Sequence, residues 1–131
     1  MARTGRALKR RPHDFADRSL KTIEKDLSTI KRLYKVKNPG EVREFLLSKR
    51  HLVDVLMEIP EKASQYFPSN KGITLEFKID PEEGYEEIIV RILINLDPDS
   101  AIEALKRFDE EWWLNEPKSH LMDICVNIGY S

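Results

Sequence analysis

The core of this protein is signalled by the run Ile88-Ile89-Val90-Arg91-Ile92-Leu93-Ile94-Asn95-Leu96. Every even-numbered position in this run is apolar, which predicts a strand with one face in the core. Ile89 and Leu93 add apolar side chains to the opposite face. A strand that is apolar on both sides is usually central in its sheet or covered by a second layer. We therefore expect this strand to organise the domain.

Two further strands are predicted around it. Before it, Ile73, Leu75, Phe77 and Ile79 alternate with polar residues, and residues 80–87 form a turn, so the two strands should make an antiparallel hairpin. After it, Asp97-Pro98 marks a helix start that should run to about residue 114. Apolar alternation over residues 122–130 then predicts a third strand, parallel to the central one if they are neighbours.

The N-terminal part is predicted to be helical. Leu20, Ile23, Leu27, Ile30 and Tyr34 recur at spacings of three and four, which indicates a helix over residues 14–36 with a narrow apolar seam. Asn38-Pro39-Gly40 ends it. Residues 41–59 fit one helix or two, and we favour a break at Ser48-Lys49-Arg50, with Ser48 as an N-cap. Pro60 either kinks this helix or begins the next turn.

Together these elements predict an α+β fold. N-terminal helices are followed by a ββαβ unit, in which a three-stranded sheet has helices packed on one face. Strand order stays open at this point.

Charge divides the chain into two parts. Residues 1–37 contain 12 Lys or Arg and four Asp or Glu, a net charge of +8, whereas residues 38–131 contain 10 and 19, a net charge of −9. We therefore expect a basic tail and amphipathic helical arm over residues 1–37, and an acidic α+β domain over residues 38–131.

Several classes of protein are disfavoured. No apolar run approaches the roughly 20 residues of a membrane helix, and no secretory signal follows the basic N-terminus, so we expect a soluble, cytoplasmic protein without membrane contact. Cys125 has no cysteine to pair with and should be an inert, mostly buried thiol. The three histidines show no metal-ligand spacing, and no nucleophile or phosphate-binding motif is present. We expect no metal, no cofactor and no catalytic residues.

Acidic residues leave one enzymatic alternative open. A hydrolase or nuclease could use acids near the last helix, but Asp97 is better explained as a helix cap. Such a site also needs acids that converge in one pocket. The candidates are Asp97, Asp99, Glu103 and Asp109.

The most distinctive string is Phe108-Asp109-Glu110-Glu111-Trp112-Trp113-Leu114. On a helix Phe108 and Trp112 share the core-facing side, while Trp113 turns about 100° away. Trp113 then either caps the sheet edge or anchors an exposed contact surface. Asp109 and Glu110 could supply the charge complement to a basic partner.

This string also carries a resemblance to a known family. Together with Leu-Val-Asp-Val-Leu at residues 52–56, Tyr66-Phe67-Pro68, Asp97-Pro98 and Asp123-Ile124-Cys125-Val126, it resembles a family of small uncharacterised bacterial α+β proteins. The match covers roughly two-thirds of the chain, and its specific motif is the double tryptophan. The resemblance implies a helix leading into a ββαβ unit, and an antitoxin-like protein encoded beside a toxin-like partner. The basic arm departs from the shorter members.

Two functional hypotheses follow. The first is a non-enzymatic protein-interaction module, the antitoxin-like half of a toxin–antitoxin pair, which would bind its partner through Trp113, Asp109, Glu110 and the seam residues Leu20, Ile23, Leu27 and Ile30. The seam could instead pack on the second helix, or pair with another protomer in a homodimer. The second is nucleic-acid binding through the arm, by Arg3, Arg6, Lys9, Arg10, Arg11 and Arg18.

Overall fold

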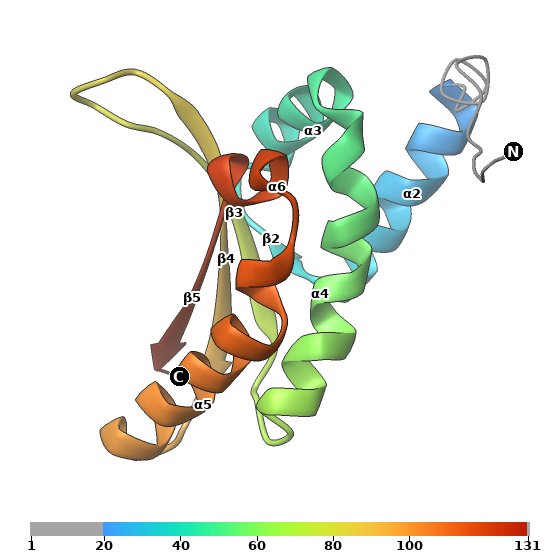
Figure 1. Ribbon diagram of the computed structural model, residues 1–131. Helices are drawn as coiled ribbons and strands as arrows, with labels where there is room; N and C mark the ends of the chain where they lie inside the picture. Colours follow the sequence, from blue (N-terminus) through green and yellow to red (C-terminus); the bar gives the residue numbers. More distant parts are fainter. Residues whose placement is uncertain (1–19, 131) are drawn as a thin grey trace, which may run out of the picture.

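The computed structural model describes residues 20–130, which form an α+β fold (Figure 1). Helices lie on one side of a four-stranded sheet, and no helix of the described residues covers the opposite side. In chain order the elements are α2 (Leu20–Leu33), β2 (Lys35–Val36), α3 (Pro39–Ser48), the 3-10 turn η1 (Arg50–Leu52), α4 (Val53–Tyr66), β3 (Ile73–Ile79), β4 (Glu86–Ile94), α5 (Pro98–Glu111), the 3-10 turn η2 (Trp113–Asn115), α6 (Lys118–Asp123) and β5 (Ile124–Tyr130).

The sheet has the strand order β2-β3-β4-β5. β3 and β4 pair antiparallel, with Ile73 opposite Ile92, which confirms the predicted hairpin. β4 and β5 pair parallel, with Ile88 opposite Ile124, so α5 and α6 lie on the crossover that returns the chain beside β4. The apolar run that indicated the core is thus a central strand.

The expectation of a three-stranded sheet is wrong, because β2 adds a fourth strand parallel to β3. Lys35 lies opposite Thr74 in this pairing. A strand of two residues has no periodicity of its own, and it exists here only because β3 supplies its hydrogen-bonding partner. The predicted first helix therefore ends at Leu33 rather than at residue 36.

The break predicted after residue 47 is confirmed. α3 ends at Ser48, and α4 starts at Val53 after η1. Ser48 is not the cap of α4, because its hydroxyl donates back to the carbonyl of Phe45 at 2.8 Å. Pro60 lies inside α4, which continues through it to Tyr66. Neither a new turn nor a helix end follows the proline directly.

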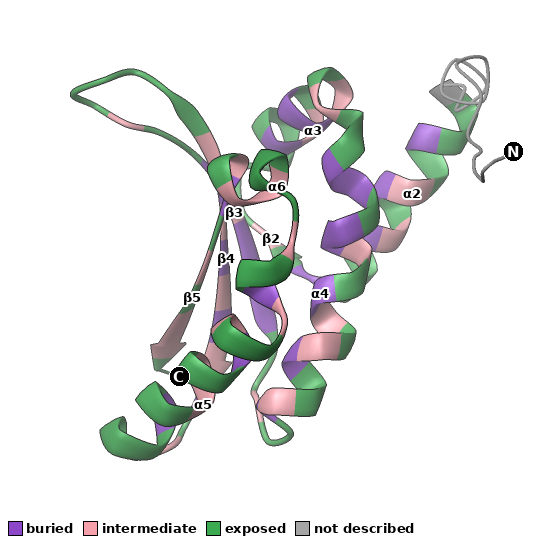
Figure 2. Ribbon diagram, viewed as in Figure 1, coloured by how far each residue is buried: buried purple, intermediate pink, exposed green. Residues whose placement is uncertain are grey.

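One hydrophobic core lies between the helices and the sheet (Figure 2). It contains Leu75, Val90 and Ile92 from the strands, and residues from α2, α3, α4 and α5. The seam residues Ile23, Leu27 and Ile30 belong to this same core, and α2 packs against α4. The predicted boundary near residue 38 therefore marks a change of charge, while the core continues across it.

Candidate interaction surfaces

The sheet presents one uncovered surface, which we call the open face. The sheet register places on it Lys35, Thr74, Glu76, Lys78, Glu87, Ile89, Arg91, Leu93, Cys125, Asn127 and Gly129. Thr74 is buried among its neighbours on this face. No helix among residues 20–130 covers this side of the sheet (Figure 1). Ile89 and Leu93 are half-buried there, although they belong to a strand whose other side is the core. Of the two explanations for a strand that is apolar on both sides, the structure shows the central position of β4, and no described helix adds a second layer on this side.

Arg91 and Gly129 are in close contact on the open face. A Cβ placed on Gly129 would lie 2.5 Å from Cδ of Arg91 and 2.8 Å from its Cγ. The aliphatic stem of Arg91 therefore occupies the space that a side chain at residue 129 would need. Long cationic side chains commonly cover apolar surface in this way while the charged head stays in water.

Cys125 is exposed on the open face, so the expectation of a mostly buried thiol is wrong. It lies opposite Ile89 in the sheet register. Partial burial by its neighbours, followed by the negative charge of Glu87, raises the pKa of the thiol. A raised thiol pKa keeps the sulfur protonated and weakly nucleophilic at neutral pH, which does not favour covalent catalysis.

The tryptophan pair adopts a different arrangement from the one predicted for a continuous helix. α5 ends at Glu111, and Trp112 has the non-helical φ of −137°. Trp113 consequently turns into the core, where it is 5% exposed, and Trp112 is half-buried. Trp112 packs edge-on against Phe108 with ring centroids 5.4 Å apart. At this corner the exposed apolar residue is Leu114, not Trp113.

The acids beside the tryptophans occupy different flanks of α5. Glu111 faces α4, where it accepts a hydrogen bond of 3.0 Å from the Tyr66 hydroxyl. Asp109 and Ile102 lie on the opposite flank by helical spacing. Asp109 is half-buried, and this burial, followed by the charge of Glu110, raises its carboxyl pKa. Glu110 itself is exposed.

The predicted arm residues fall into two groups. Arg3, Arg6, Lys9, Arg10, Arg11 and Arg18 lie outside the described residues. Leu20 opens α2, and Ile23, Leu27 and Ile30 are buried against the chain's own core, so these three are not accessible to a partner in this structure. The side of α2 and its connection to α3 that faces solvent is basic, with exposed Lys21, Lys25, Arg32, Lys35 and Lys37.

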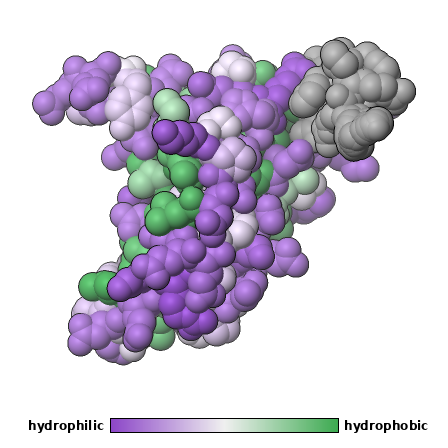
Figure 3. Space-filling model, in the orientation of Figure 1, coloured by the Kyte–Doolittle hydropathy of each residue, from purple (hydrophilic) through white to green (hydrophobic). Residues whose placement is uncertain are grey.

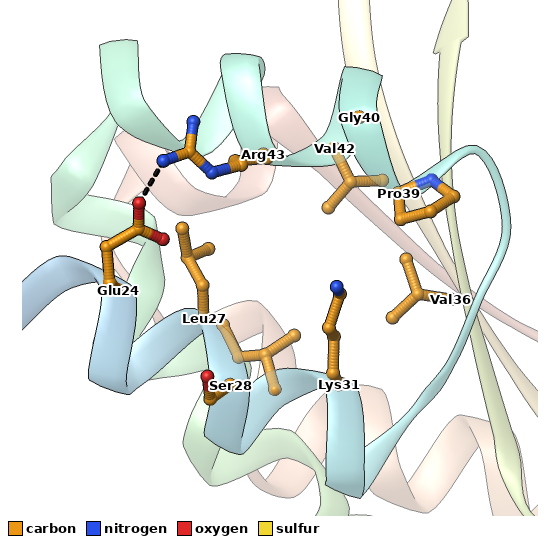
Figure 4. Close-up of a pocket in the computed structure, with 10 residues that line it drawn as sticks. Glu24, Leu27, Ser28, Lys31, Val36, Pro39, Gly40, Val42 and Arg43 are labelled. Atoms are coloured by element: carbon orange, nitrogen blue, oxygen red, sulfur yellow. Dashed lines mark hydrogen bonds and ion pairs between the residues drawn. The ribbon is translucent and has the colours of Figure 1, made fainter.

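A small cavity lies between α2, β2 and α3 (Figure 4). Leu27, Val36 and Val42 supply apolar walls, Lys31 points into the cavity from α2, and an ion pair between Arg43 and Glu24 spans one side. Its volume is about 230 Å³. Pockets that hold drug-sized ligands usually measure about 300–1,000 Å³, so this cavity is small for a substrate site.

The acids of α5 and the histidines of the described chain make local contacts. Asp97 caps α5 by accepting from the Ser100 N–H at 3.0 Å. Hydrogen bonding with the Ser100 side chain, followed by this backbone bond, lowers the pKa of Asp97. Asp99 and Glu103 are exposed. His51 and His120 stack with ring centroids 6.1 Å apart, and His120 contacts Glu116 at 3.1 Å. Within residues 20–130, no group of three or more His, Cys, Asp or Glu side chains is placed to hold a metal ion.

Comparisons with protein-family models, with curated proteins and with solved structures find no match to this chain. In the described part of the chain, no helix has the length and apolar character needed to cross a membrane. The fold and its surfaces therefore define the molecule as a two-layer α+β protein with an open sheet face.

Proposed function

We propose that this protein is a non-enzymatic protein-interaction module, the antitoxin-like half of a two-protein system that binds and neutralises a partner protein. The observation that carries the proposal is the open face around Ile89 and Leu93. These side chains lie on the central strand β4, opposite the core, and no described helix covers them. In this proposal the partner supplies the second layer.

Charge around Ile89 and Leu93 supports a protein as the occupant of the open face. Lys78 and Glu87 lie opposite each other at one end, and Arg91 lies between the two apolar residues along β4. Apolar anchors bordered by charges of both signs are typical of protein interfaces, where the charges set the orientation of the partner. The net charge of −9 over residues 38–131 favours a partner with a basic surface.

The acids of α5 have a secondary role in the proposal. Glu110 is exposed and Asp109 half-buried, so both can contribute negative potential toward a basic partner. Trp113 acts indirectly, because its buried ring holds the end of α5 on the core. The proposal assigns no catalytic role to any residue.

Co-expression with the product of the adjacent gene tests this proposal. We expect a complex that survives purification, and relief of any growth defect that the partner causes. Ile89→Lys and Leu93→Lys should each weaken the complex by about tenfold or more, because each places a charge in the apolar centre of the interface.

Leu33→Lys is the matched control, since Leu33 is an exposed leucine on α2, away from the open face. It should bind as the wild type does. Circular dichroism checks that all three variants fold. The proposal is wrong if no complex and no growth effect are seen, or if the open-face variants bind as tightly as Leu33→Lys.

A second function, nucleic-acid binding through the basic arm, is favoured by the 12 Lys or Arg among residues 1–37 and by the exposed lysines of α2. Deleting residues 1–37 would remove Ile23, Leu27 and Ile30 from the core, so a gel-shift comparison needs a milder change. Removal of residues 1–19, and separately Lys21→Glu with Lys25→Glu, should weaken binding and flatten its salt dependence. Equal binding by all forms would exclude this function.

A further inference from the structure

The two edges of the sheet differ in how far other parts of the chain cover them. At one edge, β2 and the chain that follows it cover β3, with the Lys37 N–H donating to the Leu75 carbonyl at 2.8 Å. Further along β3, the Asn38 side chain hydrogen-bonds the strand edge. It accepts from the Phe77 N–H at 3.2 Å and donates to the Phe77 carbonyl at 3.1 Å. At the other edge β5 is the last strand, and no described strand pairs with the side of β5 that faces away from β4.

β5 also has none of the features that keep an exposed edge from pairing. Its sequence, Ile-Cys-Val-Asn-Ile-Gly-Tyr over residues 124–130, contains no charged residue and no proline, and its register with β4 is uninterrupted from Ile124 to Tyr130. Exposed edges are normally blunted by lysine, proline, bulges or very short strands. The free edge of β5 is therefore ready to accept another strand.

The helix-covered side of β5 is only partly covered. Val126 and Ile128 are half-buried, and Tyr130 is 58% exposed. On the flank of α5 that points away from α4, Ile102 is 62% exposed. Met122, at the end of α6 just before β5, is 71% exposed. Figure 3 shows hydrophobic side chains gathering on this side of the molecule, around η2, α6 and β5. Partly exposed apolar side chains of β5, α5 and α6 thus lie near the free edge of β5.

We propose that the occupant of this edge is a second copy of the chain, whose β5 pairs antiparallel with the first about a twofold axis at Asn127. The two four-stranded sheets would then form one continuous sheet, with both open faces on the same side. The proposal goes beyond the partner-binding function, because it uses the strand edge and leaves the open face around Ile89 and Leu93 available to a partner protein.

Self-complementarity of β5 favours a second copy over an unrelated strand. With Asn127 on the axis, Val126 lies opposite Ile128 of the second copy, and Ile124 lies opposite Tyr130. Apolar side chains therefore meet apolar side chains on the covered face, and Asn127 meets Asn127 on the open face, where two side-chain amides can hydrogen-bond. A basic partner strand would find no acid within β5 to pair with.

Solution mass gives the first test. Light scattering coupled to size exclusion, in 0.15 M salt or above to screen the acidic bodies, should give twice the 15.4 kDa chain mass from low micromolar concentration upward. Asn127→Lys should give a monomer, because it places two ammonium groups face to face on the axis. Asn127→Thr, which keeps a neutral strand-forming residue there, should stay dimeric.

Disulfide trapping tests the register. In a Cys125→Ala background, Asn127→Cys puts two thiols directly opposite each other, at a Cβ separation of about 4.5–5.5 Å, and mild oxidation should give a covalent dimer. The wild-type protein should not cross-link, because its two Cys125 residues would be about 13 Å apart along the strands. A monomeric wild type, equal dimerisation of the Lys and Thr variants, or cross-linking through Cys125 rather than residue 127 would each overturn the proposal. None of these results depends on finding the partner protein.

Discussion

The Tyr34 hydroxyl donates a hydrogen bond of 2.6 Å to the carbonyl oxygen of Leu56. This carbonyl stands four residues before Pro60, which has no N–H to donate within α4. Tyr34, the residue directly after α2, therefore supplies the hydrogen-bond donor that Pro60 lacks. Tyr34 is 4% exposed, so the bond is shielded from water and an unpaired partner would be costly.

Removing the Tyr34 hydroxyl should destabilise the fold through this carbonyl. We expect Tyr34→Phe to lower the free energy of unfolding by about 1–3 kcal/mol, measured by urea denaturation. In a Pro60→Ala background the loss should be smaller, because residue 60 can then donate to Leu56. Tyr85→Phe, an exposed tyrosine, should change stability by no more than about 0.5 kcal/mol. If Tyr34→Phe lowers the free energy of unfolding equally with Pro60 and with Pro60→Ala, the missing N–H of the proline does not contribute to the effect.

The same tyrosine should make stability depend on alkaline pH. Burial raises the pKa of Tyr34 well above 10, so the folded state holds the hydroxyl proton more tightly than the unfolded chain does. Its contribution is complete below the unfolded pKa of about 10 and falls as the pH rises above it. The stability difference between wild type and Tyr34→Phe should therefore shrink between neutral pH and strongly alkaline pH. A constant difference across that range would contradict this assignment.

Asn38 has two roles that two substitutions can separate. Its φ of 41° is left-handed, and its side chain makes both hydrogen bonds to Phe77. Asn38→Gly keeps the backbone conformation but loses the bonds, and should cost about 1–2 kcal/mol in unfolding free energy. Asn38→Ala should cost about 1 kcal/mol more, because alanine is strained in the left-handed region. Equal stability of wild type and Asn38→Gly in urea denaturation would refute the bridging role.

The contact between Arg91 and Gly129 predicts an energetic coupling. Gly129→Ala should destabilise the protein by on the order of 1 kcal/mol, since the new Cβ displaces the stem of Arg91. In an Arg91→Ala background the same change should be neutral or stabilising, because the space is then free. A double-mutant cycle of unfolding free energies measures this, and simple additivity of the two changes would argue against the contact.

Local patterns were sufficient for the main elements of this fold. Period-two alternation located β3 and β4, and the Asp97-Pro98 start of α5 is confirmed by the hydrogen bond from Ser100 to Asp97. The break after α3 is also where the interrupted apolar stripe predicted it. Each of these features depends on residues a few positions apart, which is why a single sequence reveals them.

The sequence did not predict β2, and it left the position of Trp113 open. β2 forms because Lys35 and Val36 pair with Thr74 and Leu75, far away in the chain. Trp112 packs against Phe108 as the helical spacing predicts. Trp113, for which the sequence left two positions open, is buried, and it lies beyond the end of α5 at Glu111. Sequence spacing predicts orientation only while the helix continues.

The β3–β4 hairpin, the start of α5 at Asp97-Pro98 and the charge contrast between the arm and the remainder were all present in the amino-acid pattern. Which apolar surfaces are covered was settled by packing. The α2 seam and the second face of β4 look alike as sequence, yet α4 buries Ile23 and Ile30 while Ile89 and Leu93 face outward. Periodicity records that a side of an element is apolar, whereas its burial depends on which neighbour the rest of the chain places against it.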